Sequence, residues 1–111
     1  MSIQPKDLVE YAHGMLQPEG REVEHRNVVN RAYYGAFLAA RDLANITGGS
    51  GSVHLKVIEY YRDKKSIIGN NLDDLKRLRQ VADYEPQKNV TYHHAKKSCR
   101  IARKILRELE S

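Results

Sequence analysis

The sequence predicts one all-α domain over residues 1–111, folded as an up-and-down bundle of four main helices and one short helix. Apolar side chains recur at intervals of three and four residues along most of the chain, which is the periodicity of helices with one buried face. No segment alternates apolar and polar residues for long enough to predict a β-strand. Short stretches rich in proline, glycine and serine separate the periodic segments and indicate the connections between helices.

Proline and glycine bound the first two predicted helices. Pro5 suits the first turn of a helix, because its missing N–H has no partner at that position. Pro18 and Gly20 end this helix, and the second helix is expected over about 22–46. The Gly/Ser-rich stretch 48–52 then forms a flexible connection. It is not a phosphate-binding loop, because no Gly-Lys-Ser/Thr sequence follows it.

The next two predicted helices are separated by a turn. A short helix is expected over about 53–61, with Ser52 as its N-cap. Residues 64–71 are expected to form a turn region, because their Gly-Asn-Asn sequence is typical of turns. The fourth helix is expected to begin at residue 71 or 72 and to end before Pro86.

The second predicted helix presents two different faces. One face is apolar and is expected to lie in the core: Val29, Tyr33, Ala36, Phe37, Ala40 and Ala44. The neighbouring face is polar, basic and aromatic: Asn27, Arg31, Tyr34, Leu38, Arg41 and Asn45. This second face is interpreted either as a surface for a partner or as a solvated flank with Tyr34 at the edge of the core.

The last helix, expected over about 89–109, concentrates the positive charge. The chain has a formal net charge of +5, and segment 86–107 holds seven Lys and Arg and no Asp or Glu. One face of this helix carries a strip of four cations: Lys96, Arg100, Arg103 and Arg107. Such a strip suits a phosphate backbone, and the alternative is a solvated outer face.

Cysteine content and hydropathy set the expected compartment. The single cysteine, Cys99, cannot form an internal disulfide, which fits a reducing cytoplasm. No apolar run approaches the roughly 20 residues of a membrane span. The chain is therefore expected to be a soluble cytoplasmic protein without a membrane partner.

Arg79 is the most informative polar residue. It falls within the apolar arc of the fourth helix, where an unpaired guanidinium would be expensive to bury. Asp83 lies one turn later and can pair with it, and Tyr84 follows directly. The three residues are interpreted either as a structural ion pair with a boundary tyrosine or as a site that presents a guanidinium to phosphate.

The histidines and the cysteine do not predict a metal site or a cofactor. His93 and His94 are neighbours on a helix and do not face the same way, so a shared metal ion is not expected. Cys99 lies on the apolar face of the last helix and is interpreted as a core residue.

Two sequence blocks resemble the HEPN (higher eukaryotes and prokaryotes nucleotide-binding) domain family. Residues 31–37, Arg-Ala-Tyr-Tyr-Gly-Ala-Phe, resemble its Arg-Ala-Tyr-Tyr-x-x-Phe stretch. Residues 75–86 resemble its second block, a Leu-rich helix that ends in Arg-x-x-Ala-Asp-Tyr. The resemblance implies a helical homodimer that works with a minimal nucleotidyltransferase. It also implies a link to RNA, because many members are metal-independent ribonuclease toxins.

The sequence departs from the ribonuclease pattern of that family, in which an Arg precedes a His by four to six residues. The nearest chemical match is Lys88 before His93 or His94, and the positional match is Arg79 with Tyr84 in place of the histidine. A tyrosine has an ordinary pKa near 10 and is a poor base at pH 7.

Three functional hypotheses follow. The first is an HEPN-type dimer that binds RNA or a nucleotide, with Arg79 on phosphate, Asp83 orienting it, Tyr84 lining the site, and Arg31 and Tyr34 at its border. In the second, the chain is a ribonuclease toxin with a replaced base, either Tyr84 or His93/His94, and Arg79 and Tyr84 are the first catalytic candidates. The third is a structural adaptor. The family resemblance also implies that a nucleotidyltransferase partner adds AMP to a tyrosine beside the motif, and Tyr84 occupies that place.

Overall fold

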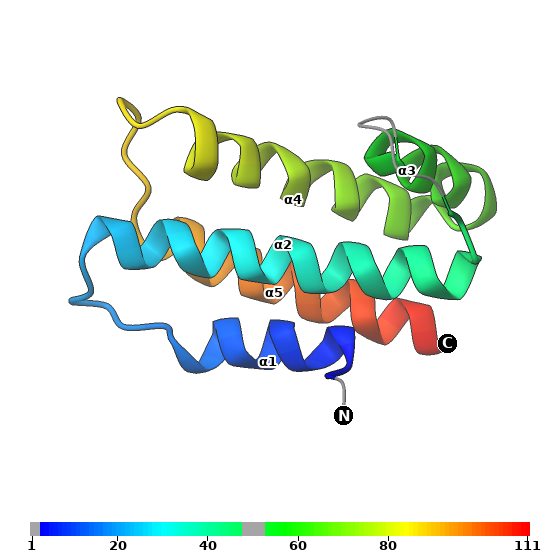
Figure 1. The fold of residues 1–111 in the computed structure, drawn as a ribbon, viewed down its shortest axis with the longest axis horizontal. Coiled ribbons are helices and arrows are strands. Elements are labelled where there is room, and N and C mark those ends of the chain that lie inside the picture. The colour runs from blue at the N-terminus through cyan, green and yellow to red at the C-terminus, as the bar shows by residue number, and fades with distance from the viewer. Residues whose placement is uncertain (1–2, 48–52) are drawn as a thin grey trace.

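The computed structural model describes residues 3–47 and 53–111, and this part of the chain contains five α-helices and no β-strand (Figure 1). No helix within these ranges is long and apolar enough to cross a membrane. The five helices and the lack of a strand in this part of the chain confirm the all-helical prediction. The helices are α1 (Pro5–Gly14), α2 (Glu22–Ala44), α3 (Val53–Lys64), α4 (Ser66–Tyr84) and α5 (Tyr92–Glu110).

Helix α2 lies at the centre of the fold and packs against each of the other four helices. In Figure 1, α4 and α1 flank it and α5 runs behind it, while α3 packs mainly on the beginning of α4. The predicted core face of α2 is buried except for Ala44, which is half-buried. The neighbouring face is largely exposed, and Tyr34 is 45% exposed. Both predicted faces of α2 are thus present.

Gly35 allows α1 to approach α2 closely. A Cβ atom at this position would lie 2.7 Å from Cγ2 of Val9 and 2.8 Å from the carbonyl oxygen of Pro5. Both distances are shorter than a carbon atom tolerates, and the second contact is to backbone that cannot rotate away. A glycine within a helix is costly in itself, so its presence here reflects helix packing.

The prediction of a turn over 64–71 is wrong. Helix α4 already begins at Ser66, and α3 continues to Lys64, so only Lys65 separates the two helices. Gly69 is buried inside α4, where a Cβ would lie 2.6 Å from the backbone nitrogen of Arg62. The Gly-Asn-Asn sequence therefore serves the close contact between α3 and α4 rather than a turn.

The other helix boundaries differ less from the prediction. Helix α5 begins at Tyr92 rather than 89, with Thr91 as its N-cap accepting a hydrogen bond from the backbone N–H of His94. Helix α1 has 10 residues and α3 has 12, so the shortest helix is the first rather than the third. The predicted N-cap Ser52 and the connection 48–52 lie outside the described residues.

Arg26 fixes the end of α4 to α2. Its Nη1 donates to the carbonyl oxygens of Val81 (3.1 Å) and Ala82 (2.9 Å), which lie in the last turn of α4. Its Nη2 donates to the carbonyl oxygen of Lys88 in the following loop and pairs with Glu22 at 2.7 Å. Carbonyl groups at the end of a helix lack hydrogen-bond donors within the helix, and Arg26 supplies donors to two of them. This anchor positions the residues that follow Ala82.

Candidate functional site

Arg79 and Asp83 form an ion pair on α4. The Nε of Arg79 donates to Oδ2 of Asp83 over 2.8 Å, and the two side chains are 21% and 22% exposed. The same carboxylate oxygen accepts a hydrogen bond of 2.8 Å from Nδ2 of Asn30 on α2. The predicted pairing is therefore confirmed, and the pair is also bonded across the seam between α2 and α4.

Two aromatic rings flank the Arg79 guanidinium. Its central carbon lies 5.8 Å from the ring centre of Tyr33 and 5.3 Å from that of Tyr84. These are cation–π distances. The hydroxyl of Tyr84 is 3.4 Å from Nη2, and this side chain is 66% exposed. Arg79, Asp83 and Tyr84 are hereafter the Arg79 cluster.

The guanidinium of Arg79 keeps unused donors. An arginine has five N–H groups, of which one here bonds Asp83 and one is directed to Tyr84. Within residues 3–47 and 53–111, the other three have no hydrogen-bond acceptor. A held guanidinium with open donors is suited to bind a phosphate or carboxylate group.

His54 is a neighbour of the cluster that the sequence analysis did not identify. Its Nδ1 is hydrogen-bonded to the hydroxyl of Tyr33, and its ring stacks on Phe37 with centres 4.1 Å apart. Burial lowers the pKa of His54, and nearby Arg79, Lys76 and Arg41 lower it further. Burial raises the pKa of Tyr33, which keeps its proton.

One feature of the sequence does indicate that a partner such as His54 must exist. Tyr33 lies on a face that is otherwise apolar, and a buried tyrosine hydroxyl needs a hydrogen-bond partner. The residue that supplies it lies 21 positions further along the chain. Helical periodicity describes one helix at a time, so it could not identify that partner.

Arg31 and Tyr34 are the two predicted border residues, and they lie on α2, which packs against the helix of the Arg79 cluster. They follow Asn30 and Tyr33, which contact the cluster, and both are exposed on α2. In the described part of the chain, neither forms a hydrogen bond or an ion pair with the cluster. The ring of Tyr34 instead packs edge-on against Phe37, with centres 6.5 Å apart. No contact with the cluster is therefore recorded for either residue in this part of the chain, and their place at its border stays a prediction.

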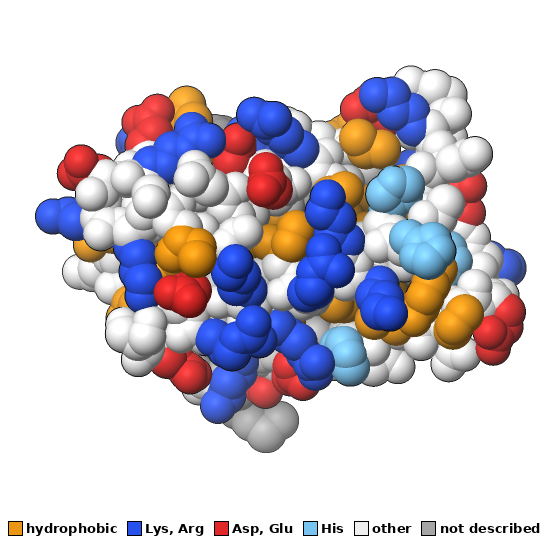
Figure 2. Space-filling view, turned by 180° about the vertical axis from the view of Figure 1, so that it is seen from behind, with side chains coloured by type: hydrophobic (Ala, Val, Ile, Leu, Met, Phe, Trp, Pro, Cys, Tyr) orange, Lys and Arg blue, Asp and Glu red, His pale blue; other side chains and the backbone are white. Residues whose placement is uncertain are grey.

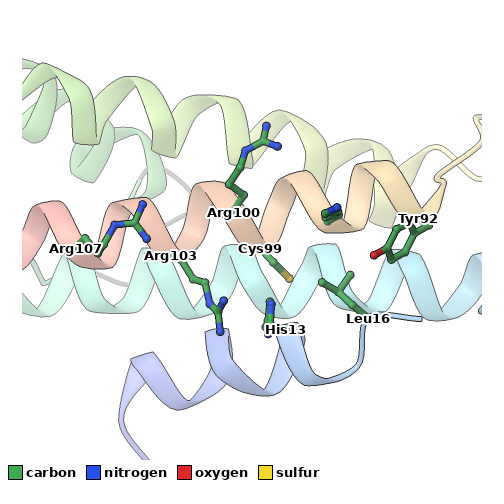
Figure 3. Close-up of a pocket in the computed structure, with 8 residues that line it drawn as sticks. His13, Leu16, Tyr92, Cys99, Arg100, Arg103 and Arg107 are labelled. Carbon is green, nitrogen blue, oxygen red and sulfur yellow. The ribbon is translucent and has the colours of Figure 1, made fainter. Parts of the chain in front are cut away.

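A second candidate site lies between α1 and α5. Lys and Arg side chains gather in the middle of the face opposite to that of Figure 1 (Figure 2). Among them is a groove of about 490 Å³, hereafter the α1–α5 groove (Figure 3). It is lined by His13, Leu16, Tyr92, Lys96, Cys99, Arg100, Arg103 and Arg107. The cationic strip predicted for the last helix therefore forms one wall of a groove.

The cations of this groove are not equivalent. Arg103 reaches from α5 to α1, whereas Arg100 points to the other edge of α5 (Figure 3). Arg103 forms two hydrogen bonds, of 2.8 and 3.1 Å, with the carboxylate of Glu10. These bonds lower the pKa of Glu10 and raise that of Arg103. Arg100 and Arg107 form no ion pair within the described ranges.

The alternative catalytic candidates near the start of α5 are engaged locally. Lys88 pairs with Glu85 at 3.1 Å. The Nδ1 of His94 accepts from the backbone N–H of Thr91 at 2.9 Å, as part of the α5 cap. His93 is exposed beside Tyr92. None of these contacts brings a histidine to Arg79.

Cys99 is buried, as the sequence predicts, and its side chain also lines the α1–α5 groove. Burial raises the pKa of its thiol to about 11, so the thiol is protonated at neutral pH. No group of three or more metal-binding side chains occurs among the residues that the structure describes.

The two sequence blocks that resemble the HEPN family lie against each other in the fold. The first block is part of α2 and the second part of α4, and Tyr33 of one contacts Arg79 of the other. This contact is observed within the structure of this chain and does not depend on the resemblance.

Comparisons of the chain with models of protein families, with curated proteins and with solved structures found no match.

Proposed function

We propose that this chain is an HEPN-type helical protein that forms a homodimer, binds RNA or a nucleotide through phosphate, and acts with a minimal nucleotidyltransferase in a toxin–antitoxin-like pair. The observation that carries the proposal is the Arg79 guanidinium. Asp83 and two aromatic rings fix its position, and three of its N–H groups have no acceptor among the described residues. The family resemblance supplies the expected ligand and partner.

The geometry supports a binding role for each member of the Arg79 cluster. Asp83 uses a single N–H of the guanidinium, so most of the donors of Arg79 stay available to a ligand. A phosphate oxygen can bind the remaining donors in a bidentate way. The exposed hydroxyl of Tyr84, 3.4 Å from Arg79, is placed to donate to the same phosphate.

Two exposed tyrosines support the proposed dimer. Tyr34 and Tyr84 are 45% and 66% exposed, and they lie on either side of the seam between α2 and α4. A two-fold interface uses the same patch twice. An interface at this seam would therefore cover these side chains and bring two copies of Arg79 towards each other.

Metal-independent RNA cleavage is the second candidate function, and the position of His54 favours it. The lowered pKa keeps this imidazole neutral at pH 7, so it can accept the proton of a ribose 2′-hydroxyl, unlike Tyr84. Nδ1 is bonded to Tyr33, which leaves Nε2 for substrate. Nε2 acts as the base only in the tautomer whose Nδ1–H donates to the Tyr33 oxygen.

Tyr84 is the proposed acceptor of AMP. Its hydroxyl oxygen would attack the α-phosphorus of ATP, pyrophosphate would leave, and the phenolic proton would pass to solvent or to a base of the nucleotidyltransferase. The exposure of this side chain permits a partner to reach it. Arg79, with its ring contact of 5.3 Å, lies where it can neutralise the added phosphate.

The test compares Arg79→Gln with Arg77→Gln. Both residues are on α4, and Arg77 pairs with Asp73 but is 73% exposed, so the second variant controls for the loss of one charge. Binding of short RNA and of AMP is measured by titration, and sedimentation measures the oligomeric state. We expect a dimer, and at least tenfold weaker binding for Arg79→Gln alone. Equal binding by both variants, or a monomer at tens of micromolar (a range typical of weak dimers), would contradict the proposal.

RNA incubated with the protein in the presence of a chelator separates binding from cleavage. Intact RNA supports the binding role. Cleavage that is lost in His54→Gln supports the second candidate. If sedimentation shows a dimer that binds neither RNA nor nucleotide, the chain is a structural adaptor.

A further inference from the structure

The α1–α5 groove is a second cationic surface, separate from the Arg79 cluster. One wall comes from α5 and the other from His13 at the end of α1 and Leu16 just after it, whereas the Arg79 cluster lies on α4 and contacts α2. Leu16 and Cys99 form an apolar part of its lining, and cations stand along α5 (Figure 3). A hollow that combines apolar lining with a row of cations differs from a solvated helix face, where charged side chains stand alone in water.

The four cations of the groove are spread in a row along α5 and do not converge on one position. Lys96, Arg100, Arg103 and Arg107 follow one another along α5. At 1.5 Å per residue, the row is about 16 Å long, with about 4 to 6 Å between successive Cα positions. A single phosphate would meet only one or two of these side chains. A row of this length matches an extended chain of several phosphates.

An aromatic ring stands at one end of this row. Tyr92, the first residue of α5, lines the groove and is half-buried. It packs edge-on against His25, with ring centres 6.2 Å apart. Aromatic rings beside a cationic track are the usual way in which proteins hold single-stranded nucleic acids, since each base has a face that can stack.

We propose that the α1–α5 groove binds one strand of single-stranded nucleic acid, with its phosphates along α5 and a base against Tyr92. The proposal rests on the proposed function for the class of ligand, but it concerns a different surface from the Arg79 cluster. A duplex is disfavoured, because its bases are paired and stacked inside and none is available to Tyr92. An acidic protein segment would satisfy the cations but would make no use of the ring.

Glu10 acts as a competitor for the strand. It is bonded twice to Arg103, and its negative charge stands at the edge of the groove. A phosphate that approaches Arg103 must displace this carboxylate or bind beside it. Removal of the charge by Glu10→Gln is therefore expected to strengthen binding about threefold or more, because Arg103 becomes available.

The experiment measures the binding of labelled ten-nucleotide oligouridine, oligothymidine and a duplex of the same length by fluorescence anisotropy. The groove variant is Lys96→Ala with Arg100→Ala. The matched control is Lys97→Ala with Lys104→Ala, because these lysines are exposed on the same helix and do not line the groove. We expect the groove variant to lose at least tenfold in affinity and about one to two units of salt slope. The control is expected to lose less than threefold.

The aromatic contact is tested at Tyr92. Tyr92→Phe keeps the ring and is expected to bind as the wild type does, whereas Tyr92→Leu is expected to bind several-fold more weakly. Equal losses in the groove variant and its control, or tighter binding of the duplex, would overturn the proposal. Oligoglutamate binding that equals oligouridine binding, together with no effect of Tyr92→Leu, would assign the groove to an acidic protein instead.

The outcomes also separate this proposal from the proposed function. If the groove variant binds normally while Arg79→Gln does not, the groove proposal fails and the function of the Arg79 cluster stands. If the reverse holds, the groove proposal stands and the role of Arg79 fails. If the wild type binds no oligonucleotide at low salt, the groove proposal fails, and the titration with AMP then decides whether the Arg79 cluster binds a nucleotide.

Discussion

The two candidate sites hold their arginines in different ways. At the seam between α2 and α4, Arg79 is bonded to Asp83 and lies between two rings, with a side chain that is 21% exposed. In the α1–α5 groove, Arg100 and Arg107 are exposed and have no ion-pair partner in the ranges described. A held guanidinium loses little conformational entropy on binding, whereas free side chains must be ordered. The seam is therefore suited to bind one phosphate specifically, and the groove to attract a polyanion with little specificity.

The first prediction tests whether stability depends on the seam and not on the groove. Arg26→Met removes the donors for the carbonyl groups at the end of α4. We expect a loss of about 2–4 kcal/mol in the free energy of unfolding, because part-buried carbonyl oxygens lose a charged donor and Glu22 loses its ion-pair partner. Arg100→Met, a matched change in the groove, is expected to alter stability by less than about 0.5 kcal/mol. Urea denaturation measures both, and equal effects would refute this difference between the regions.

The second prediction concerns the wall of the groove. Gly35→Ala would place a Cβ 2.8 Å from the carbonyl oxygen of Pro5 and push α1 away from α2. We expect a loss of about 1–3 kcal/mol in thermal or urea unfolding. Gly14→Ala is the control, because no atom lies within 4 Å of a Cβ there. A Gly35→Ala variant as stable as the control would show that α1 does not pack as described.

The sequence predicted the core more completely than the sites. Helical periodicity identified the buried face of α2, since burial of a regular stripe is a property of one helix. It also paired Arg79 with Asp83, because residues four apart on a helix are neighbours. It did not find Arg26, His54 or Glu10. Their partners lie on other helices, and only the packed fold brings them together.

The prediction of a turn over 64–71 was wrong for the same physical reason, a contact between two helices. Gly-Asn-Asn is typical of turns, and nothing local shows that Gly69 is needed for contact with Arg62 on another helix. The cationic strip on α5 was visible in the sequence, but the hollow beside it was not, because α1 forms its other wall.

The third prediction uses pH to probe the seam. The pKa of His54 is lowered in the folded chain from an ordinary value of 6.5, so the unfolded chain binds its proton more readily. Stability from this residue is therefore complete above about pH 6.5 and falls as the pH decreases through the range below it. We expect His54→Gln to flatten the pH dependence of unfolding between about pH 6.5 and 5. An unchanged slope would mean that His54 is not shielded from water.

The smallest expected effect is that of Tyr84→Phe on stability. The hydroxyl is exposed and 3.4 Å from Arg79, so its loss is expected to cost less than about 1 kcal/mol. Its effect on function is expected to be large, because the mass gain upon incubation with ATP and the nucleotidyltransferase should disappear. Tyr11→Phe, also exposed but on α1, serves as the control. Modification of the same peptide in Tyr84→Phe would exclude Tyr84 as the acceptor.

The central claim is that Arg79 is held in place and available to phosphate, and arginine side-chain NMR tests it most directly. The Nε–H group of Arg79 donates to Asp83, which is expected to slow its exchange with water and give a visible resonance. Titration with AMP is predicted to shift this resonance at lower concentrations than the resonances of Arg100 and Arg107. If AMP shifts the arginines of α5 while the Arg79 resonance does not move, the phosphate-binding role of the seam is contradicted.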